Sequence, residues 1–297
     1  MANDLSTHAV GRGDNPALGI LMMMTAIGVL STMNVFVKHI GPDFHPMQVT
    51  FIRNFIATMI IVPFILRAGG VGILKTKRPW GHAARALGGV LGNAGFFYAF
   101  ARLPLADVMV ISQAVPLFAT LLAVVFLNEN VGWRRWSAII CGFLGVVVAL
   151  DPSGTIDLAS LATVFATLCW ASTILLMRSL GSTESPYTIV FYYMAAGTVI
   201  AAMFMPWVWV ATPIETIKLF VAAGVLGALG QYLMTFALKV AEASVVSPFN
   251  YTAIIWGICF DLVIWSIWPS WPTVIGAMFI SAAGLYIFHR EALLKAP

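Results

Sequence analysis

The chain has 297 residues, of which 60% are hydrophobic and only 9% are charged, and its mean hydropathy is +0.92. A water-soluble domain carries about 25% charged residues because its surface faces water, so this composition excludes a soluble globular protein and indicates a surface covered by lipid. The net charge of +4 does not indicate nucleic-acid binding, because the basic residues are scattered in loops between apolar runs.

Ten apolar runs follow one another along the chain, each near the length of about 20 residues that a helix needs to cross a bilayer. They cover residues 17–38, 46–67, 80–101, 105–127, 133–150, 156–178, 187–209, 214–238, 243–265 and 271–289. The sequence therefore predicts an all-α membrane protein with ten transmembrane helices. We expect a first five-helix repeat at 17–150, a second at 156–289, and cytoplasmic tails at 1–16 and 290–297.

The distribution of lysine and arginine predicts the orientation. With the N-terminus in the cytoplasm, the inside segments carry twelve basic residues and the outside loops carry three, namely Lys38, Arg102 and Lys218. Basic residues concentrate in cytoplasmic loops, so both termini are expected in the cytoplasm. The polar N-terminal stretch lacks the features of a signal peptide. We expect a multi-pass membrane protein.

A glycine motif indicates that the two halves are repeats. Residues Gly89–Gly95 read GVLGNAG and residues Gly224–Gly230 read GVLGALG, at the same point of each half. Each half holds an odd number of helices, so the second half must enter the membrane from the opposite side, which makes the repeat inverted. Glycines one turn apart favour close helix packing, with a backbone hinge as the alternative.

Several stretches resemble a known family. They include Leu103–Asp107 (LPLAD), Gln113–Phe118 (QAVPLF) and Ala237–Tyr251 (ALKVAEASVVSPFNY). From residue 17 onward the chain resembles the drug/metabolite transporter superfamily, and within it the EamA-type ten-helix exporters. The resemblance implies an inner-membrane exporter of amino acids or related metabolites that works by alternating access. The aromatic amino-acid exporters of the YddG group are one candidate among its relatives.

Polar side chains within the spans are the candidate substrate-binding residues, because a polar group in a bilayer needs a partner. Gln113 and Asn250 occupy corresponding positions in the two repeats and point to a shared central site, and Trp170 lies in the middle of a span. Together with tyrosines these residues suit a ligand with a flat apolar part and a polar end. The expected substrate-binding set is Asn34, Tyr98, Gln113, Trp170, Tyr192, Tyr193, Ser247, Asn250 and Tyr251.

Each of these residues also has a structural alternative. A serine hydroxyl can bond its own helix backbone, the amides can join helices without touching a ligand, and Trp170 can pack in the core. Arg53 lies about seven residues, or roughly 10 Å, into the second span. Two roles stay open for it, a structural clamp or a contact to a substrate carboxylate. Asp261, near the outer end of the ninth span, is expected to reach water.

The sequence predicts a secondary transporter that exports amino acids, with aromatic or other neutral ones favoured, or related small metabolites. A drug or toxic-cation efflux carrier is the alternative, and a channel or an intramembrane enzyme is a second one from another class. No catalytic motif and no metal-like cluster is present, and Cys141, Cys169 and Cys259 lie in apolar runs. We expect no enzyme activity, no cofactor and no metal, with a small-molecule substrate and the lipid bilayer as partners. The oligomeric state stays open.

Overall fold

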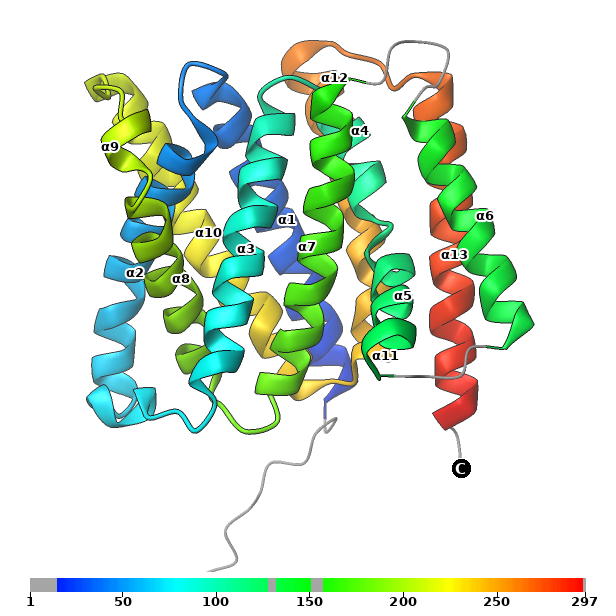
Figure 1. The fold of residues 1–297 in the computed structure, drawn as a ribbon, viewed down its shortest axis with the longest axis horizontal. Helices are drawn as coiled ribbons and strands as arrows, with labels where there is room; N and C mark the ends of the chain where they lie inside the picture. The colour runs from blue at the N-terminus through cyan, green and yellow to red at the C-terminus, as the bar shows by residue number, and fades with distance from the viewer. Residues whose placement is uncertain (1–14, 128–131, 151–156, 296–297) are drawn as a thin grey trace, which may run out of the picture.

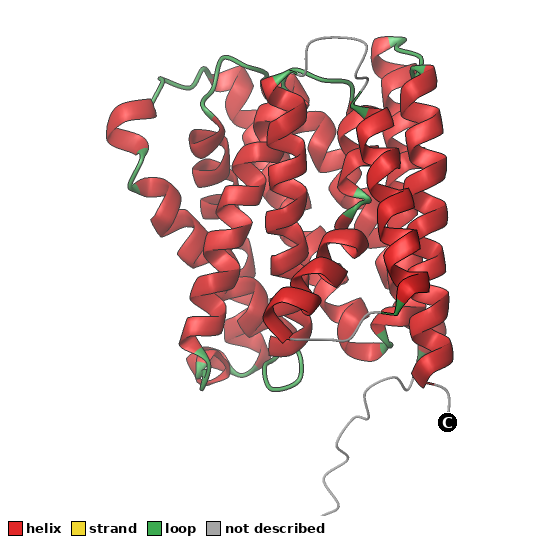
Figure 2. Ribbon diagram, turned by 45° about the vertical axis from the view of Figure 1, so that its right-hand side comes forward, coloured by secondary structure: helices red, strands yellow, loops and turns green. Residues whose placement is uncertain are grey.

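The computed structural model describes residues 15–127, 132–150 and 157–295, which form a bundle of helices aligned along one direction (Figure 1). The helices are α1 (Pro16–Ile40), α2 (Pro46–Ala68), η1 (Gly70–Leu74), α3 (Pro79–Phe100), α4 (Leu105–Ser112), α5 (Val115–Leu127), α6 (Trp133–Ala149), α7 (Leu158–Leu180), α8 (Pro186–Ala202), α9 (Met205–Val208), α10 (Ile214–Val240), α11 (Ala243–Val246), η2 (Ser247–Tyr251), α12 (Thr252–Trp265) and α13 (Trp271–Lys295). Helices and loops alone make up the described residues (Figure 2). Most of the predicted tail at 1–16 lies outside them, and so do residues 151–156, up to the start of the second predicted repeat.

The bundle has the ten spans that the sequence predicts. Seven helical segments of the described chain are long and apolar enough to cross a bilayer, with α4 and α5 counted as one span and η2 and α12 as another. The helices α3, α6 and α8 complete the set. This confirms an all-α membrane protein of ten transmembrane helices in two inverted five-helix repeats.

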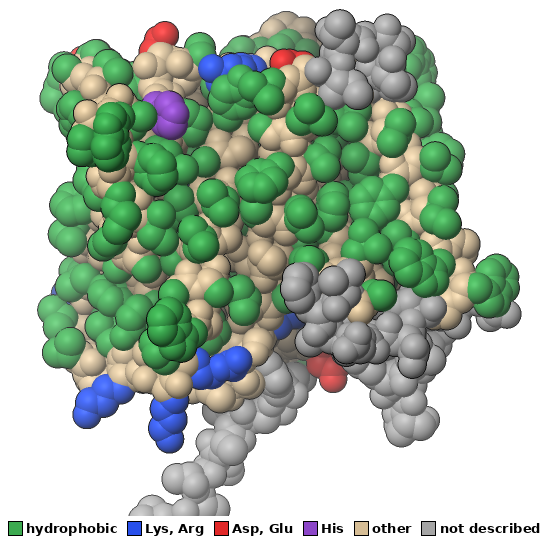
Figure 3. Space-filling view, viewed as in Figure 1, with side chains coloured by type: hydrophobic (Ala, Val, Ile, Leu, Met, Phe, Trp, Pro, Cys, Tyr) green, Lys and Arg blue, Asp and Glu red, His purple; other side chains and the backbone are tan. Residues whose placement is uncertain are grey.

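The outer surface fits a lipid environment. Hydrophobic side chains cover the middle of the face seen in Figure 3, while lysine and arginine gather mainly at its lower end, where α13 ends. We call this end, at which α1 also begins, the terminal end of the bundle, and the opposite one the far end. Several tryptophans near helix ends are largely exposed, as expected for residues at a membrane interface. They are Trp80, Trp133, Trp207, Trp268 and Trp271.

Two helix ends differ from the prediction. The span expected at 187–209 stops at Ala202 and resumes as the short α9, because Pro206 cannot donate the backbone hydrogen bond that a continuous helix needs. The last helix is longer than predicted: α13 continues to Lys295, so most of the expected tail at 290–297 is helical. The apolar pattern marks only the lipid-embedded part of a helix, and therefore could not show that α13 extends beyond it.

The fourth and ninth spans are interrupted near their middle, although the sequence predicts both as continuous. The fourth breaks between α4 and α5 at Gln113 and Ala114, and the ninth passes from α11 through the 3-10 turn η2 into α12. A proline lies at each break, with Pro116 just after the first and Pro248 inside η2, and proline removes one helix hydrogen bond. The two interruptions occupy corresponding places in the inverted repeats.

The two repeats are packed against each other through pairs of helices. The most extensive contacts join α1 with α10, α3 with α7, α6 with α13, α2 with α8, and α2 with α10, and every pair takes one helix from each repeat. The repeated glycine motif serves this packing. A Cβ on Gly95 would lie 2.9 Å from Ala166 Cβ of α7, and one on Gly230 would lie 2.6 Å from Leu30 Cδ2 of α1. Both last glycines of the motif therefore bring equivalent helix pairs together.

A buried ion pair links the two repeats at the far end. Lys38 Nζ of α1 lies 3.6 Å from Asp261 Oδ1 of α12 and donates to the Leu103 carbonyl at 2.7 Å. Asp261 Oδ2 accepts a bond from the Ala106 backbone N–H at the start of α4, also at 2.7 Å. Asp261 is only 1% exposed, so the expectation that it reaches water is wrong. Sequence position alone could not show that α4 and α1 cover this carboxylate.

Replacement of Asp261 by alanine should lower the free energy of unfolding by about 3 kcal/mol, because it leaves Lys38 without its counter-ion in a mostly buried place. The measurement is reversible unfolding of the purified protein in detergent. The double variant Lys38→Met with Asp261→Leu should regain much of this stability, since an apolar pair of similar size removes the unpaired charge. A double variant as unstable as Asp261→Ala would show that the ion pair is not the source of the effect.

Candidate functional site

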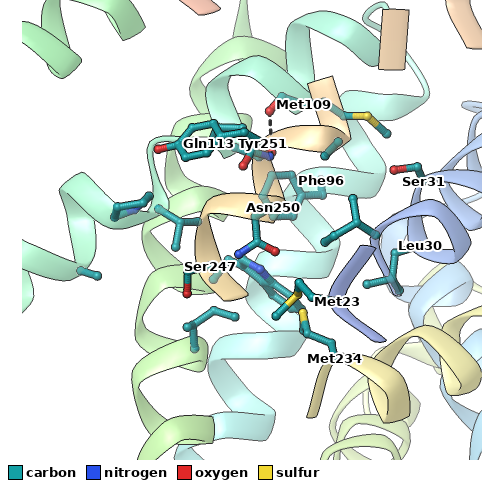
Figure 4. A pocket seen from close by; sticks show the side chains of 18 of the residues that line it. Met23, Leu30, Ser31, Phe96, Met109, Gln113, Met234, Ser247, Asn250 and Tyr251 are labelled. Atoms are coloured by element: carbon teal, nitrogen blue, oxygen red, sulfur yellow. Dashed lines mark hydrogen bonds between the residues drawn. The ribbon is translucent and has the colours of Figure 1, made fainter. Parts of the chain in front are cut away.

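A cavity of about 490 Å³ lies inside the bundle, and helices of both repeats line it (Figure 4). From the first repeat the lining comes from α1, α2, α3, α4 and α5, and from the second it comes from α7, α10, η2, α12 and α13. A volume of roughly 300–1,000 Å³ is usual for the binding site of a small organic molecule. The cavity is therefore large enough for a metabolite and sits between the repeats.

The interrupted spans meet at this cavity. Gln113 lies at the break of the fourth span, and Ser247, Asn250 and Tyr251 belong to η2 of the ninth, and all four line the cavity. Figure 4 shows these side chains around one space. Irregular backbone within a membrane is tolerated where it is buried in protein or lines a cavity. Discontinuous helices at the interface of inverted repeats are the usual place of a transporter's binding site.

The structure brings most of the candidate residues together and leaves three apart. Those that line the cavity are Asn34, Arg53, Gln113, Trp170, Ser247, Asn250 and Tyr251. Tyr98, Tyr192 and Tyr193 are absent from the described lining. Substrate contact therefore stays a prediction for the first group, and the three tyrosines leave the proposed site.

Each of the three tyrosines has another partner. The Tyr98 ring lies 3.8 Å from the Arg102 guanidinium, and the Tyr192 hydroxyl donates to the Leu74 carbonyl at 2.9 Å. Tyr193 is buried and its hydroxyl accepts a bond from Asn93 Nδ2 at 3.1 Å. Neighbouring residues on a helix point about 100° apart. Tyr98 is therefore turned away from the cavity that Phe97 lines, and the sequence did not indicate which face of α3 points inward.

Several residues that line the cavity are not among those that the sequence predicts. Asn93 and Gln231 both line the cavity, the first inside the glycine motif of α3 and the second directly after the same motif in α10. A polar residue beside a packing motif in both repeats is a signal that could have revealed them. Methionines also contribute flexible, polarisable surface that can adapt to a ligand. They are Met23, Met33, Met109 and Met234.

Two arginines give the described lining a positive charge. Arg53 of α2 and Arg178 of α7 both line the cavity, and no aspartate or glutamate occurs among the described lining residues. Arg178 Nη2 donates to Ser247 Oγ at 2.9 Å, which links the last turn of α7 to η2. A site with this charge suits a ligand with a neutral or anionic group more than an organic cation.

Comparison with known proteins agrees with this geometry. A model of the EamA-like transporter family matches residues 17–150 and 157–288. The chain belongs to the EamA-like transporter family. It is therefore a multi-pass membrane transporter of small metabolites and not an enzyme, and the resemblance to the drug/metabolite transporter superfamily is confirmed.

Relatives of this EamA-family protein carry different substrates. It is 28% identical to the S-adenosylmethionine uptake transporter of Rickettsia bellii, over 93% of this chain and 94% of that protein. It is 30% identical to the riboflavin transporter of Rhizobium johnstonii, over 92% of each. It is 27% identical to the pseudopaline exporter of Pseudomonas aeruginosa, over 89% of this chain and 94% of that one. A solved crystal structure with a TM-score of 0.64 and 17% identity covers 94% of this chain and 99% of its own, and supports the fold alone.

The cavity should be open to water-soluble reagents. In a background without Cys141, Cys169 and Cys259, an Asn250→Cys thiol should react with a small charged thiol reagent, because a cavity of this size with amide, hydroxyl and guanidinium groups in its lining can hold water. Thr163→Cys is the matched control, since Thr163 is fully buried outside the cavity lining and bonds the Ala159 carbonyl. Labelling of both cysteines at equal rates, measured by mass spectrometry of the folded protein, would contradict a discrete central cavity.

Proposed function

We propose that this protein is a secondary carrier that binds its substrate in the central cavity and moves it by alternating access. The observation that carries the proposal is the meeting of both interrupted spans at one cavity between inverted repeats. Interrupted spans have fewer backbone hydrogen bonds to keep them straight, and they therefore bend more readily than continuous helices. The cavity lining reaches Arg178 in the last turn of α7, whereas the far end is held by the Lys38–Asp261 pair.

The chemistry of the lining supports a substrate with a flat aromatic part and a polar end. Trp170 and Phe96 offer ring surfaces, and Asn34, Gln113 and Asn250 offer amides that can donate and accept hydrogen bonds. Riboflavin and S-adenosylmethionine, named for two relatives, also combine a flat heteroaromatic ring with polar groups. We keep aromatic or other neutral amino acids as the favoured class, with nucleoside-like and flavin-like metabolites as the runner-up.

Export across a bacterial inner membrane is the proposed direction and place. The named relatives include uptake transporters and an exporter, so family membership supports either direction. The basic residues gathered at the terminal end support a cytoplasmic location for both termini. On that orientation the cavity of this conformation reaches toward the cytoplasm, where an exporter collects its substrate.

The described lining argues against efflux of cationic drugs, because it holds Arg53 and Arg178 and no carboxylate. A channel is disfavoured by the packing at the far end. Val37, Leu105 and Val108 are almost completely buried there, next to the Lys38–Asp261 pair. A carrier must close one end while the other is open, and this arrangement fits such a closed end.

Counterflow in proteoliposomes tests the proposal. The labelled ligands are tryptophan and phenylalanine for the favoured class, and S-adenosylmethionine and riboflavin for the runner-up. We expect saturable exchange for the ligands of one of these two classes. Trp170→Ala should lower the apparent affinity by about tenfold or more, because it removes a ring contact together with its buried area. Trp207→Ala is the matched control, since Trp207 is 81% exposed near a helix end and should leave exchange unchanged.

The possible outcomes of the counterflow experiment distinguish the carrier mechanism, the position of the ring-binding site and the substrate class. Saturable exchange that both variants retain equally would keep the carrier and move the ring-binding site away from Trp170. Flux that does not saturate and shows no exchange would indicate a channel. Exchange of S-adenosylmethionine or riboflavin without exchange of any amino acid would replace the favoured substrate class with the runner-up.

A further inference from the structure

Two arginines are buried in the interior of the bundle. Arg53 of α2 is 1% exposed and Arg85 of α3 is fully buried. Among the described residues, neither forms an ion pair with a carboxylate, and Tyr193 is the ionisable neighbour that interacts with both. A cation in the interior of a membrane protein needs a partner, because leaving water without compensation costs several kcal/mol.

Arg85 finds its partners within the protein. Its Nη1 donates to the Ile189 carbonyl at 3.3 Å, its Nη2 donates to Gln231 Oε1 at 3.4 Å, and its guanidinium lies 4.2 Å from the centre of the Tyr193 ring. It does not belong to the described cavity lining. These contacts give Arg85 a structural role, and one of them fixes the orientation of Gln231.

Of these two arginines, Arg53 is the one that lines the cavity. The Nε atoms of both arginines are buried without a partner within the described chain. Arg53 Nη1 donates to Asn54 Oδ1 at 3.2 Å, and the Tyr193 hydroxyl is a second hydrogen-bonding neighbour. The Phe97 ring centre lies 5.7 Å from the guanidinium carbon. Gly227 of α10 leaves room for the group, because a Cβ there would lie 2.7 Å from Nε. The guanidinium is thus accommodated by the packing and left with unused donors.

Gln231 adds a second donor to the same part of the cavity. Because its Oε1 accepts the bond from Arg85, its amide nitrogen is left as the group that can donate to a ligand. Arg53 and Gln231 come from α2 and α10, which are packed against each other. Gly227, whose Cβ position lies beside the Arg53 guanidinium, is one helical turn before Gln231 on α10, so both donors lie at the same part of the cavity, where they suit an oxyanion.

We propose that Arg53 and Gln231 form an oxyanion subsite that binds the carboxylate or phosphate group of the transported metabolite. The inference rests on the proposed function and narrows its substrate class to metabolites that carry such a group. The planar guanidinium matches the geometry of both oxyanions. The flat part of the substrate then lies toward Trp170 and η2, on the side of the cavity formed by the second repeat. Arg85 acts as a positioning residue through its bond to Gln231.

The first test uses oxyanions alone, so it does not depend on the identity of the aromatic part of the substrate. Acetate and inorganic phosphate at equal ionic strength should each be compared with chloride for their effect on the unfolding temperature of the detergent-purified protein. At least one oxyanion should raise this temperature in the wild type and not in Arg53→Gln. Arg102→Gln is the matched control, since Arg102 lies at the far end against Tyr98, outside the cavity lining, and should keep the response.

The second test compares ligands that differ only in charge. Tryptophan should bind more tightly than tryptophanamide, and Arg53→Gln should remove this preference by weakening the acid alone, by roughly tenfold to a hundredfold, the range for one hydrogen bond to a charged group. Arg53→Lys keeps the charge and should keep part of the preference, which guards against a variant that merely folds poorly. A purely structural Arg53 would change both affinities equally.

Each result bears on a different claim. No stabilisation by either oxyanion, or an equal response in Arg53→Gln, overturns the subsite. Stabilisation by phosphate alone that depends on Arg53 supports the subsite and assigns it to phosphorylated metabolites. Arg53-dependent stabilisation without counterflow of any aromatic probe supports the subsite while the aromatic class of the proposed function fails.

Discussion

Close approach of helices from opposite repeats is the constraint on which the structure depends. Lipid chains are as apolar as leucine, so helices in a bilayer gain little from hydrophobic burial against one another and rely on close packing instead. Small residues make that packing available. Gly95 lies against Ala166, Gly230 lies against Leu30, and a Cβ on Gly145 of α6 would lie 3.1 Å from the Gly276 carbonyl of α13. Every major helix pair therefore binds one repeat to the other.

The cavity follows from the same symmetry. An inverted repeat places the fourth and ninth spans at equivalent positions, and α4 and α12 are packed against each other. Both spans are interrupted, at Gln113 in one and around Asn250 in the other, and both interruptions line the cavity. Backbone that leaves the helix needs other polar partners, and a cavity that holds water or a polar ligand supplies them. The inverted repeat therefore explains why the two interruptions lie together, at the cavity that we propose as the binding site.

The sequence predicts the spans and the inverted repeat well, because apolar runs and an odd helix number need no knowledge of packing. It also predicts Gln113 and Asn250 as cavity residues, since repeat positions relate them. It could not place Tyr98, because a single step along a helix turns a side chain from the cavity to another face. It misjudged Asp261, because the depth of this carboxylate depends on α1 and α4, which cover it. Tertiary packing decides each of these details.

The buried charges of this protein fall into two kinds. Asp261 at the far end is met by Lys38 and by a backbone N–H, and Arg85, away from the cavity lining, is met by a carbonyl, an amide and a ring, although its Nε has no partner within the described chain. Arg53 keeps an unused donor beside a cavity that both repeats enclose. Stability alone would favour an apolar residue there, since replacing buried charge by well-packed apolar side chains is often neutral or stabilising. An arginine retained with unused donors at the cavity wall is therefore explained by a ligand that brings the missing acceptor.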